Sequence, residues 1–370
     1  MKRVAIIGGG FAGLAAARVL ARHSRDVQVT LLDGRDTSDF LPLLPDVVGG
    51  RVAPDAASVP LAELLQGMGV EFVRDQVRAV DPAHRRVEGA RTRLEYDRLI
   101  VACGSVTNCP AGLQRQALVL DGVRDALAIA GTFPDAAPQH AVIVGGGYTG
   151  VEIASNLWRL FRRRGTRGAI TLVEATGGLL PALPAWVRDH VMANLGQMGV
   201  RCVTNCRLDR VDGSRAVLSN GEVIDPAALI WTAGVRLPDF AQALIGPASA
   251  QRRIPVDRFL RFSDEVFVAG DAALFLDQDQ PLRMCVLHAA RQGEAAAANI
   301  LRGLRDEPLR EFKPLDPGYV LPLANGRSCG TVLGANLKGP VPTWLHYVMC
   351  AYRSQTWRNK RRVLGAMLRG

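Results

Sequence analysis

The chain alternates short apolar runs with alanine-rich segments of helical character. The run Val4–Ile7 predicts a buried strand, the alanine-rich stretch after it predicts a helix, and Val27–Asp33 predicts a second strand that ends on an acid. The same order returns later, with an apolar run at Ala141–Val144, a helical segment, and a strand at Ala169–Glu174. Strands that alternate with helices in this way predict an α/β fold with parallel sheets.

Three glycines stand at the turn between the first strand and the helix of each repeat. The first set is Gly8, Gly10 and Gly13, and the second is Gly145, Gly147 and Gly150. In a strand–turn–helix unit the first glycine allows the tight turn, the second lets a pyrophosphate approach the backbone, and the third lets helix and strand pack closely. The free N–H groups at the helix start attract phosphate. We therefore predict two dinucleotide sites, against the alternative of two ordinary tight turns.

Each repeat ends its second strand with an acid that is placed to bind a ribose. Asp33 follows Gly13 by 20 residues, and Glu174 ends the corresponding strand of the second repeat. No arginine occurs in Ala175–Gly178. A carboxylate accepts a hydrogen bond from a free 2′-hydroxyl and repels a 2′-phosphate, so NADH is favoured over NADPH. The arginines of segment 159–167 are the alternative source of positive charge.

Three further apolar strands end at a glycine, where a ligand can approach the backbone. They span residues 96–104, 225–234 and 264–271, and the last of them places Asp271 beside Gly270. Residues 39–52 are apolar but interrupted by two prolines, which favours a fixed loop and a short helix. A longer helix is expected between residues 285 and 299.

Charge is concentrated at the carboxyl end. The chain has 370 residues, enough for two domains or more, and a formal net charge of +10. Residues 318–370 contain eight Lys or Arg and no Asp or Glu, so this segment carries most of the excess. The segment also has apolar residues at roughly helical spacing: Trp344, Val348, Tyr352, Trp357, Leu364 and Met367. This pattern predicts a basic amphipathic helix at an anionic membrane surface, with a homodimer interface as the alternative.

Several classes of protein are disfavoured. No run of about 18 apolar residues predicts a transmembrane helix, and no secretory signal precedes the first strand. No known nucleic-acid-binding module accompanies the basic end, so we expect no nucleic acid partner. The seven cysteines form no C-x-x-C motif and are expected to be reduced: Cys103, Cys109, Cys202, Cys206, Cys285, Cys329 and Cys350. No histidine lies near Cys202 and Cys206 to complete a set of four ligands, so we expect no metal site.

The two glycine-rich units, Leu99–Ser105 and Val266–Asp271 occur in the order used by two-dinucleotide-binding-domain flavoproteins of the pyridine nucleotide-disulfide oxidoreductase superfamily. Within that superfamily, Phe40–Gly50, Gly104–Asn108 and Gly147–Glu152 most resemble type II NADH dehydrogenases, which are single-subunit NADH:quinone oxidoreductases. The end, from Gly339 onward, is similar to that family's membrane-docking end.

The resemblance implies two Rossmann-like domains, the second inserted in the first, and a short C-terminal module. The expected division is residues 1–112 and 243–312 for the FAD-binding domain, 113–242 for the NADH-binding domain and 313–370 for the C-terminal module. FAD is expected to contact Gly8, Gly10, Phe11, Ala12, Gly13, Asp33, Gly34, Arg35, Pro42, Ala102, Cys103, Gly104, Gly270, Asp271 and Ala289. NADH is expected to contact Gly147, Tyr148, Thr149, Gly150, Glu174, Ala233 and Gly234.

Three residues are candidates for catalysis. Glu152 matches the family glutamate near the nicotinamide–flavin junction, and its alternative role is that of a first-turn acid that complements the helix dipole. The family's quinone-side helix ends in Gln-Gln-Gly, whereas this chain keeps only Gln292 before Gly293. His288 on the same helix is a candidate for proton delivery to a reduced quinone, or else a satisfied interior histidine.

The implied activity is hydride transfer from NADH to flavin, followed by electron transfer to a quinone or another small acceptor. We expect it on the cytoplasmic face of the cell membrane. A disulfide reductase is disfavoured, because Phe40–Pro45 contains no cysteine pair. A sulfide:quinone oxidoreductase remains an alternative through Cys109 and Cys329, whose other reading is incidental thiols. A flavin-containing redox sensor that binds NADH with little turnover is the other alternative.

Overall fold

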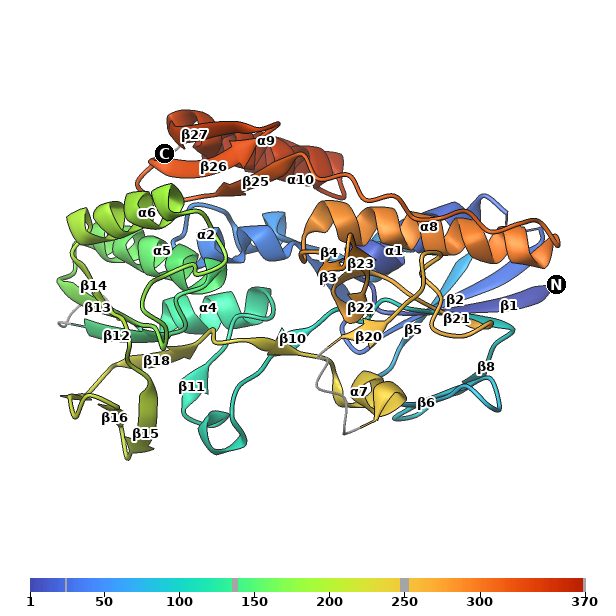
Figure 1. The fold of residues 1–370 in the computed structure, drawn as a ribbon, viewed down its shortest axis with the longest axis horizontal. Coiled ribbons are helices and arrows are strands. Elements are labelled where there is room, and N and C mark those ends of the chain that lie inside the picture. Colours follow the sequence, from blue (N-terminus) through green and yellow to red (C-terminus); the bar gives the residue numbers. More distant parts are fainter. Residues whose placement is uncertain (24, 135–138, 247–252, 369–370) are drawn as a thin grey trace. The chain divides into compact units, whose positions relative to one another are not determined.

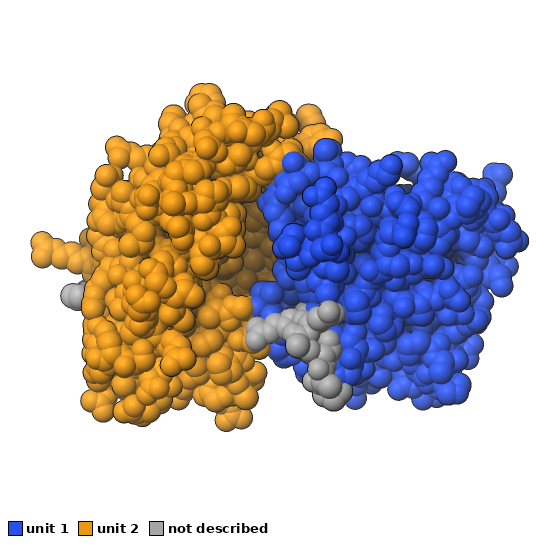
Figure 2. Space-filling model, in the orientation of Figure 1, with its two compact units in different colours: residues 1–38, 59–106, 235–316 blue, residues 39–58, 107–234, 317–370 orange. Residues whose placement is uncertain are grey.

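The computed structural model describes residues 1–23, 25–134, 139–246 and 253–368. These residues form two compact units, each assembled from three stretches of chain (Figure 2). Unit 1 comprises residues 1–38, 59–106 and 235–316, and unit 2 comprises residues 39–58, 107–234 and 317–370. The expected four-part division by cofactor stays a prediction, since compactness does not test where a cofactor binds.

Unit 1 is built on a five-stranded parallel sheet (Figure 1). In spatial order its strands are β21 (Val266–Val268), β9 (Arg98–Val101), β1 (Lys2–Ile7), β2 (Val27–Asp33) and β5 (Val70–Arg74). The chain order reverses direction between β1 and β9. Ligands of such sheets bind outside the carboxyl ends of the strands at this switch point.

Alternate residues of β1 face opposite sides of this sheet. Val4 and Ile6 pack under the helices α1 (Phe11–Ala21) and α8 (Val286–Leu304). Ala5 and Ile7 pack instead with residues of a small antiparallel sheet and of α7 (Asp239–Ile245). Both faces are therefore covered, which explains the continuous apolar run in the sequence.

Unit 2 repeats the order of four of these strands in a second parallel sheet, whereas the fifth, at the edge, comes first in the chain here and last in unit 1. Its strands are β11 (Ala117–Leu118), β18 (Ala228–Trp231), β12 (Gln139–Val144), β13 (Gly168–Val173) and β14 (Val200–Val203). The helices α5 (Tyr148–Arg164) and α6 (Ala185–Gln197) pack against the sheet. The repeat that the sequence predicts is thus a repeat of topology.

Helix α5 ends at Gly165, whose φ of +66° is the left-handed conformation common after a helix. Arg162, Arg163 and Arg164 form its last turn, where positive charge complements the helix dipole. A helix of 17 residues is about 25 Å long. Arg162, Arg163 and Arg164 therefore lie at the opposite end of α5 from the glycine loop, and the alternative that the arginines of segment 159–167 approach the ribose stays a prediction.

The carboxyl end of the chain forms an antiparallel sheet and two helices within unit 2. They are β25 (Gly318–Leu321), β26 (Ser328–Val332), β27 (Ala335–Gly339), α9 (Pro340–Arg353) and α10 (Trp357–Met367). The sequence predicts one basic amphipathic helix here, and the structure corrects this to two. Ser354 follows α9 with an extended ψ of 139°, and Thr356 caps α10 by accepting the N–H of Asn359 at 3.2 Å. The local capping preference of threonine thus starts a new helix.

The remaining elements are short. The helical ones are η1 (Leu41–Leu43), α2 (Leu44–Val48), η2 (Pro54–Ala56), α3 (Leu61–Leu65), η3 (Ala111–Leu113), α4 (Val123–Gly131) and η4 (Gly270–Ala272). The strands are β3 (Thr37–Asp39), β4 (Ser58–Pro60), β6 (Val77–Asp81), β7 (Arg86–Gly89), β8 (Arg93–Glu95), β10 (Val106–Thr107), β15 (Leu208–Asp212), β16 (Arg215–Leu218), β17 (Val223–Ile224), β19 (Val235–Arg236), β20 (Ile254–Pro255), β22 (Ala273–Leu274), β23 (Leu276–Asp277) and β24 (Gln280–Pro281). Among the described residues, no helix has both the length and the apolar character that a membrane crossing requires.

Candidate functional site

The glycine loop of unit 1 leaves open space in front of α1. A Cβ on Gly13 would lie 1.8 Å from the carbonyl oxygen of Gly8, so this position admits no side chain. Gly8 has a φ of +107°, and a Cβ there would lie 2.3 Å from the carbonyl oxygen of Ala102 at the end of β9. A Cβ on Gly10, by contrast, would meet no atom within 4 Å. Gly10 is the N-cap of α1, so no side chain at that position binds the free N–H groups of the helix start. The first turn of α1 also has no acid. This arrangement suits a phosphate group.

The predicted ribose acid of unit 1 is fixed by the same loop. Asp33 ends β2, and its Oδ2 accepts the backbone N–H of Gly9 at 2.7 Å. Its Oδ1 accepts the N–H of Arg35 at 2.8 Å. An ionised carboxylate has about four acceptor positions, so capacity for ribose hydroxyls remains.

Gln292 on α8 positions the turn that follows β21. It is buried, and its Oε1 accepts the backbone N–H of Gly270 at 2.8 Å. Gly270 has a φ of +77°, and its missing Cβ would lie 3.1 Å from the Cβ of Ala12. The next residue of α8, Gly293, would carry a Cβ 2.0 Å from the carbonyl oxygen of Ala12. Gln292 thus ties the β21 turn to α8, and the missing side chains of Gly270 and Gly293 let α1 pack closely against both.

The other residues predicted to bind FAD lie at five places in unit 1 and one in unit 2. Phe11 and Ala12 start α1, and Gly34 and Arg35 follow β2. Ala102, Cys103 and Gly104 follow β9, while Asp271 and Ala289 lie in η4 and α8. Pro42 belongs to η1 in unit 2.

Burial shifts the pKa of two side chains in the predicted FAD-binding set. It raises the pKa of the Cys103 thiol to about 12, so this thiol is neutral at physiological pH. It also raises the pKa of Asp271, although the guanidinium of Arg253 opposes the shift. Arg253 donates from Nε to the backbone carbonyl of Asp271 at 3.2 Å.

Unit 2 builds the same loop a second time. A Cβ on Gly150 would lie 1.9 Å from the carbonyl oxygen of Gly145, and Gly145 has a φ of +112°. A Cβ on Gly147 would meet no atom within 4 Å. Glu174 Oε2 accepts the N–H of Gly146 at 2.7 Å, just as Asp33 accepts the N–H of Gly9 in unit 1. The two repeats therefore share one design of phosphate cradle and loop-bound carboxylate.

The remaining residues predicted to bind NADH border this loop. Tyr148 and Thr149 start α5, directly after the open position of Gly147. Ala233 and Gly234 follow β18 at the same edge of the sheet, and Gly234 has a φ of +80°. Trp231 Nε1 donates to the carbonyl oxygen of Ala233 at 3.1 Å, which fixes this turn.

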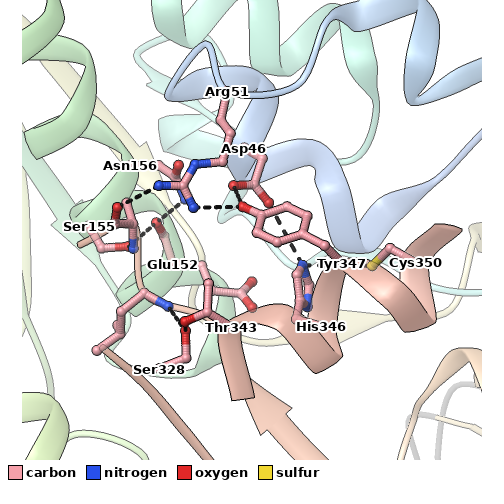
Figure 3. Close-up of polar contacts among 12 residues, drawn as sticks. Asp46, Arg51, Glu152, Ser155, Asn156, Ser328, Thr343, His346, Tyr347 and Cys350 are labelled. Atoms are coloured by element: carbon pink, nitrogen blue, oxygen red, sulfur yellow. Dashed lines mark hydrogen bonds and ion pairs between the residues drawn. The ribbon is translucent and has the colours of Figure 1, made fainter. Parts of the chain in front are cut away.

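A buried polar cluster, which the sequence reasoning missed, lies in unit 2 (Figure 3). Tyr347 on α9 donates its hydroxyl to Asp46 Oδ1 on α2 at 2.6 Å. Arg51 donates from Nη1 to the Tyr347 oxygen at 2.9 Å and from Nη2 to the carbonyl oxygen of Ala324 at 2.8 Å. Each of these three side chains is less than a tenth exposed.

His346 extends the cluster along α9. Its Nε2 lies 3.8 Å from Asp46 Oδ2 and 3.7 Å from Cys350 Sγ. Burial by itself lowers the pKa of His346, but the neighbouring Cys350 and Asp46 outweigh it and hold the pKa well above its ordinary value. The direction of this shift favours the protonated form of His346 beside Asp46. The signal that could have revealed the cluster is the presence of Asp46, Arg51 and His346 in otherwise apolar segments.

Glu152 faces this cluster from α5 (Figure 3). Burial raises its pKa to about 8, with Asp46 adding to the shift and His346 opposing it. Glu152 is the fifth residue of α5, and the first turn of that helix has no acid. The alternative role of Glu152 as a first-turn acid is therefore wrong.

The raised pKa of Glu152 predicts a pH-dependent stability. A carboxyl that ionises at about pH 4.5 in the unfolded chain and about pH 8 in the folded one contributes stability below pH 4.5. That contribution is lost as the pH rises through 8. The melting temperature of the parent protein should therefore fall more between pH 6 and pH 9 than that of Glu152→Gln, measured by differential scanning calorimetry. Equal falls would show that Glu152 is already ionised at pH 6.

Comparison with known proteins identifies the family of this chain. Residues 2–293 match the family described as pyridine nucleotide-disulphide oxidoreductase. The chain belongs to this family. It is 28% identical over 380 residues to demethylphylloquinone reductase NdbB of Synechocystis sp., covering 97% of this chain and 93% of that protein. It is 25% identical to the type II NADH:quinone oxidoreductase of Staphylococcus aureus, covering 94% of each.

Solved structures agree on the fold. NDH2 from Plasmodium falciparum in complex with NADH matches with a TM-score of 0.87 over 100% of this chain and 98% of that chain, at 16% identity. The sulfide:quinone oxidoreductase of Aquifex aeolicus matches with a TM-score of 0.79 at 18% identity, covering 98% and 92%. The α/β architecture of this chain, with its two parallel sheets, is thus the fold of two-dinucleotide-binding flavoproteins.

The residues of this family member fit FAD and NADH. Each cradle offers an open glycine position, a helix start without an acid and a carboxylate held by the loop. When bound, FAD supplies the hydride and electron chemistry, and the protein supplies position and electrostatics.

Cys109 and Cys329, the two thiols that sulfide chemistry would need, lie in surroundings that disfavour the reactive thiolate. Burial raises the pKa of Cys109, and it raises the pKa of Cys329, which lies in β26, to about 11. Both thiols are free, buried and neutral at physiological pH. Within the described part of the chain, no three His, Cys, Asp or Glu side chains are grouped so that they could hold a metal ion.

Proposed function

We propose that this flavoprotein oxidises NADH through bound FAD and passes two electrons to a quinone-type acceptor. The observation that carries the proposal is the pair of phosphate cradles with loop-bound carboxylates on one chain. The names of the curated relatives support it, since they describe NADH:quinone and demethylphylloquinone reduction. The protein's own part is to bind both nucleotides, orient their rings and hold protons near the site.

The roles of individual residues follow from their contacts. Asp33 and Glu174 bind the riboses of FAD and NADH, and Gln292 keeps the Gly270 turn in place for the flavin. The raised pKa of Glu152 favours its protonated form at neutral pH, so that Glu152 can hold a proton where it faces the cluster that contains His346 (Figure 3).

Anaerobic titration of the purified flavoprotein with NADH, followed by addition of a soluble quinone, tests this function. We expect NADH to bleach the flavin absorbance and the quinone to restore it. In steady state, oxidation of NADH no faster than with free flavin would contradict an enzymatic role and favour the redox sensor. Recovery of the flavin absorbance with ferricyanide but with no quinone would contradict the proposed acceptor.

Glu174 should decide whether the protein prefers NADH or NADPH. Replacing it by arginine removes the acceptor of the 2′-hydroxyl and supplies a partner for a 2′-phosphate. We expect Glu174→Arg to weaken NADH binding about tenfold and to improve NADPH relative to NADH, measured as kcat/KM for each. Glu174→Gln separates loss of charge from gain of a cation. An unchanged preference in Glu174→Arg would show that Glu174 does not contact the ribose.

An anionic membrane surface is the proposed partner of the C-terminal helices. Exposed apolar side chains on them include Val341, Trp344, Val348, Tyr352, Trp357 and Leu364. Arg361 is exposed beside them, while Arg358 and Arg362 pair with Asp55 within unit 2. Exposed tryptophans next to basic residues are typical of a helix that lies in a bilayer interface. We propose the cytoplasmic membrane face as its location.

Replacing both exposed tryptophans tests this contact without disturbing the buried face of α9. We expect Trp344→Ser/Trp357→Ser to reduce flotation with vesicles that contain phosphatidylserine about tenfold or more. Leu127→Ser, which alters an exposed apolar residue on α4, is the control and should float like the parent. If the variant still floats but changes its sedimentation coefficient, the surface is a homodimer interface instead.

A further inference from the structure

Helix α10 has two faces of different character and a charged flank between them. The exposed face, at the spacing of one helical stripe, carries Trp357, Arg361 and Leu364. The buried face carries Asn359, Val363 and Ala366. Arg358 and Arg362 are four residues apart and therefore lie next to each other on the flank. A long cationic side chain on this flank can turn either toward the body of unit 2 or toward a surface on which the exposed face rests.

One carboxylate of unit 2 pairs with both flank arginines. Asp55 lies in η2, against which α10 packs, and its Oδ2 is 3.7 Å from Arg358 Nη2. Arg362 donates from Nη1 to the same oxygen. The side chains of Asp55 and Arg358 are 60% and 73% exposed, so water still solvates the pair. Such exposed ion pairs are weak, and Asp55 therefore holds the arginines without binding them tightly.

The charges of α10 call for an anion at this flank. Residues 318–370 contain no Asp or Glu, and both ion pairs that the described residues form with α10 use Asp55. Two cations at positions i and i+4 of a helix repel each other, and an anion between them relieves the repulsion. A phosphate group suits two arginines better than one carboxylate oxygen does, because each guanidinium can donate a pair of parallel N–H bonds to phosphate oxygens.

We propose that Arg358 and Arg362 form a binding site for the phosphate of an anionic lipid, and that Asp55 occupies this site until the protein meets a membrane. The inference rests on the proposed membrane contact of the C-terminal helices. Insertion of Trp357 and Leu364 brings the flank to the level of the lipid headgroups. There the negative surface attracts each arginine and repels Asp55. The exchange needs only side-chain rotations, so α10 stays packed through its buried face.

Flotation of the flavin-loaded full chain tests the site, with phosphatidylcholine vesicles that contain or lack phosphatidylserine. Asp55→Asn removes the internal anion and keeps the shape of the side chain. We expect this variant to bind the phosphatidylserine vesicles about tenfold more tightly than the parent, and the pure phosphatidylcholine vesicles like the parent. Its melting temperature should stay close to that of the parent, because an exposed ion pair contributes little to stability. Equal affinities of parent and variant for the anionic vesicles would overturn the proposal.

Asp209→Asn is the matched control for overall charge. Asp209 lies in β15 of the same unit, its side chain is 58% exposed against 60% for Asp55, and it pairs with Arg210 at 3.2 Å. The control thus removes the same charge from an equally exposed pair away from α10. We expect Asp209→Asn to float like the parent. An equal gain in both variants would show that only net charge matters and would overturn the site.

Replacing the two arginines identifies them as the ligands of the phosphate. Arg358→Gln/Arg362→Gln should bind the anionic vesicles about tenfold less tightly than the parent. Adding Asp55→Asn to this pair should then bring no gain, because the arginines that it would release are absent. If Asp55→Asn still raises the affinity by the full amount, repulsion between Asp55 and the membrane explains its effect, and the site is wrong.

The behaviour of the parent separates this inference from the proposed membrane contact. If neither the parent nor Asp55→Asn floats with any of the vesicles, both the membrane contact and the phosphate site are wrong. If the parent floats and Asp55→Asn binds with the same affinity, the phosphate site alone is wrong and the membrane contact stands.

Discussion

Gly147→Ala should leave the protein folded and loaded with flavin while weakening NADH binding about a hundredfold or more. Gly147 has a φ of −76°, which alanine adopts freely, and a Cβ there meets no atom of the chain within 4 Å. The methyl group would instead occupy the space in which the pyrophosphate approaches the start of α5. The melting temperature should therefore stay unchanged, and the loss should appear in the dissociation constant for NADH, measured by flavin reduction or calorimetry.

Two further glycines give this prediction its controls. Gly150→Ala should lower both the melting temperature and NADH affinity, because its Cβ would collide with the carbonyl oxygen of Gly145 at 1.9 Å. Gly196→Ala, on α6 in the same unit and with no atom within 4 Å of its Cβ, should leave NADH affinity unchanged and should not lower the melting temperature, since alanine favours a helix. If Gly147→Ala binds NADH like the parent, the second cradle does not hold the pyrophosphate.

Asp46→Ala should destabilise the protein by about 3–5 kcal/mol, the range seen when one partner of a buried charged pair is removed. The change takes away the acceptor of the Tyr347 hydroxyl and leaves His346 without its neighbouring carboxylate. Tyr347→Phe should cost about 1–3 kcal/mol, since Asp46 and Arg51 each lose one hydrogen bond in a buried place.

The matched control for this cluster lies on the same helix. Tyr352 on α9 is exposed, and Tyr352→Phe should be close to neutral. The measurement is the change in free energy of unfolding in urea, followed by tryptophan fluorescence. If Tyr347→Phe proves as mild as Tyr352→Phe, the hydroxyl does not bind Asp46 in solution. A double-mutant cycle of Tyr347→Phe and Arg51→Met then separates the contact of the hydroxyl with Arg51 from its contact with Asp46.

The parts of the fold that the sequence predicts well are those whose chemistry is local. The strand–glycine turn–helix unit is encoded within about 30 residues, so the sequence predicts both repeats, their loop glycines and an acid, Asp33 or Glu174, at the end of each second strand. It does not predict the break between α9 and α10, because apolar residues keep a roughly helical spacing across it. Here the extended backbone of Ser354 and the cap at Thr356 outweighed the pattern.

The buried cluster shows where sequence reasoning stops. Asp46 and Tyr347 are about 300 residues apart, and their sequence neighbourhoods contain no motif that pairs them. The same holds for Glu152, whose raised pKa depends on burial and on groups from α2 and α9. A pKa shift is a property of the surroundings, and these are assembled only when the chain folds.

By itself, the sequence determined that this chain is an α/β protein with two dinucleotide cradles, because a tight turn that must carry glycine leaves a local signature. Only the tertiary structure decided which segments join each unit and that α9 buries Tyr347 and His346 while exposing Trp344. These outcomes depend on contacts between segments distant along the chain and on the burial that such contacts create, which no local pattern records.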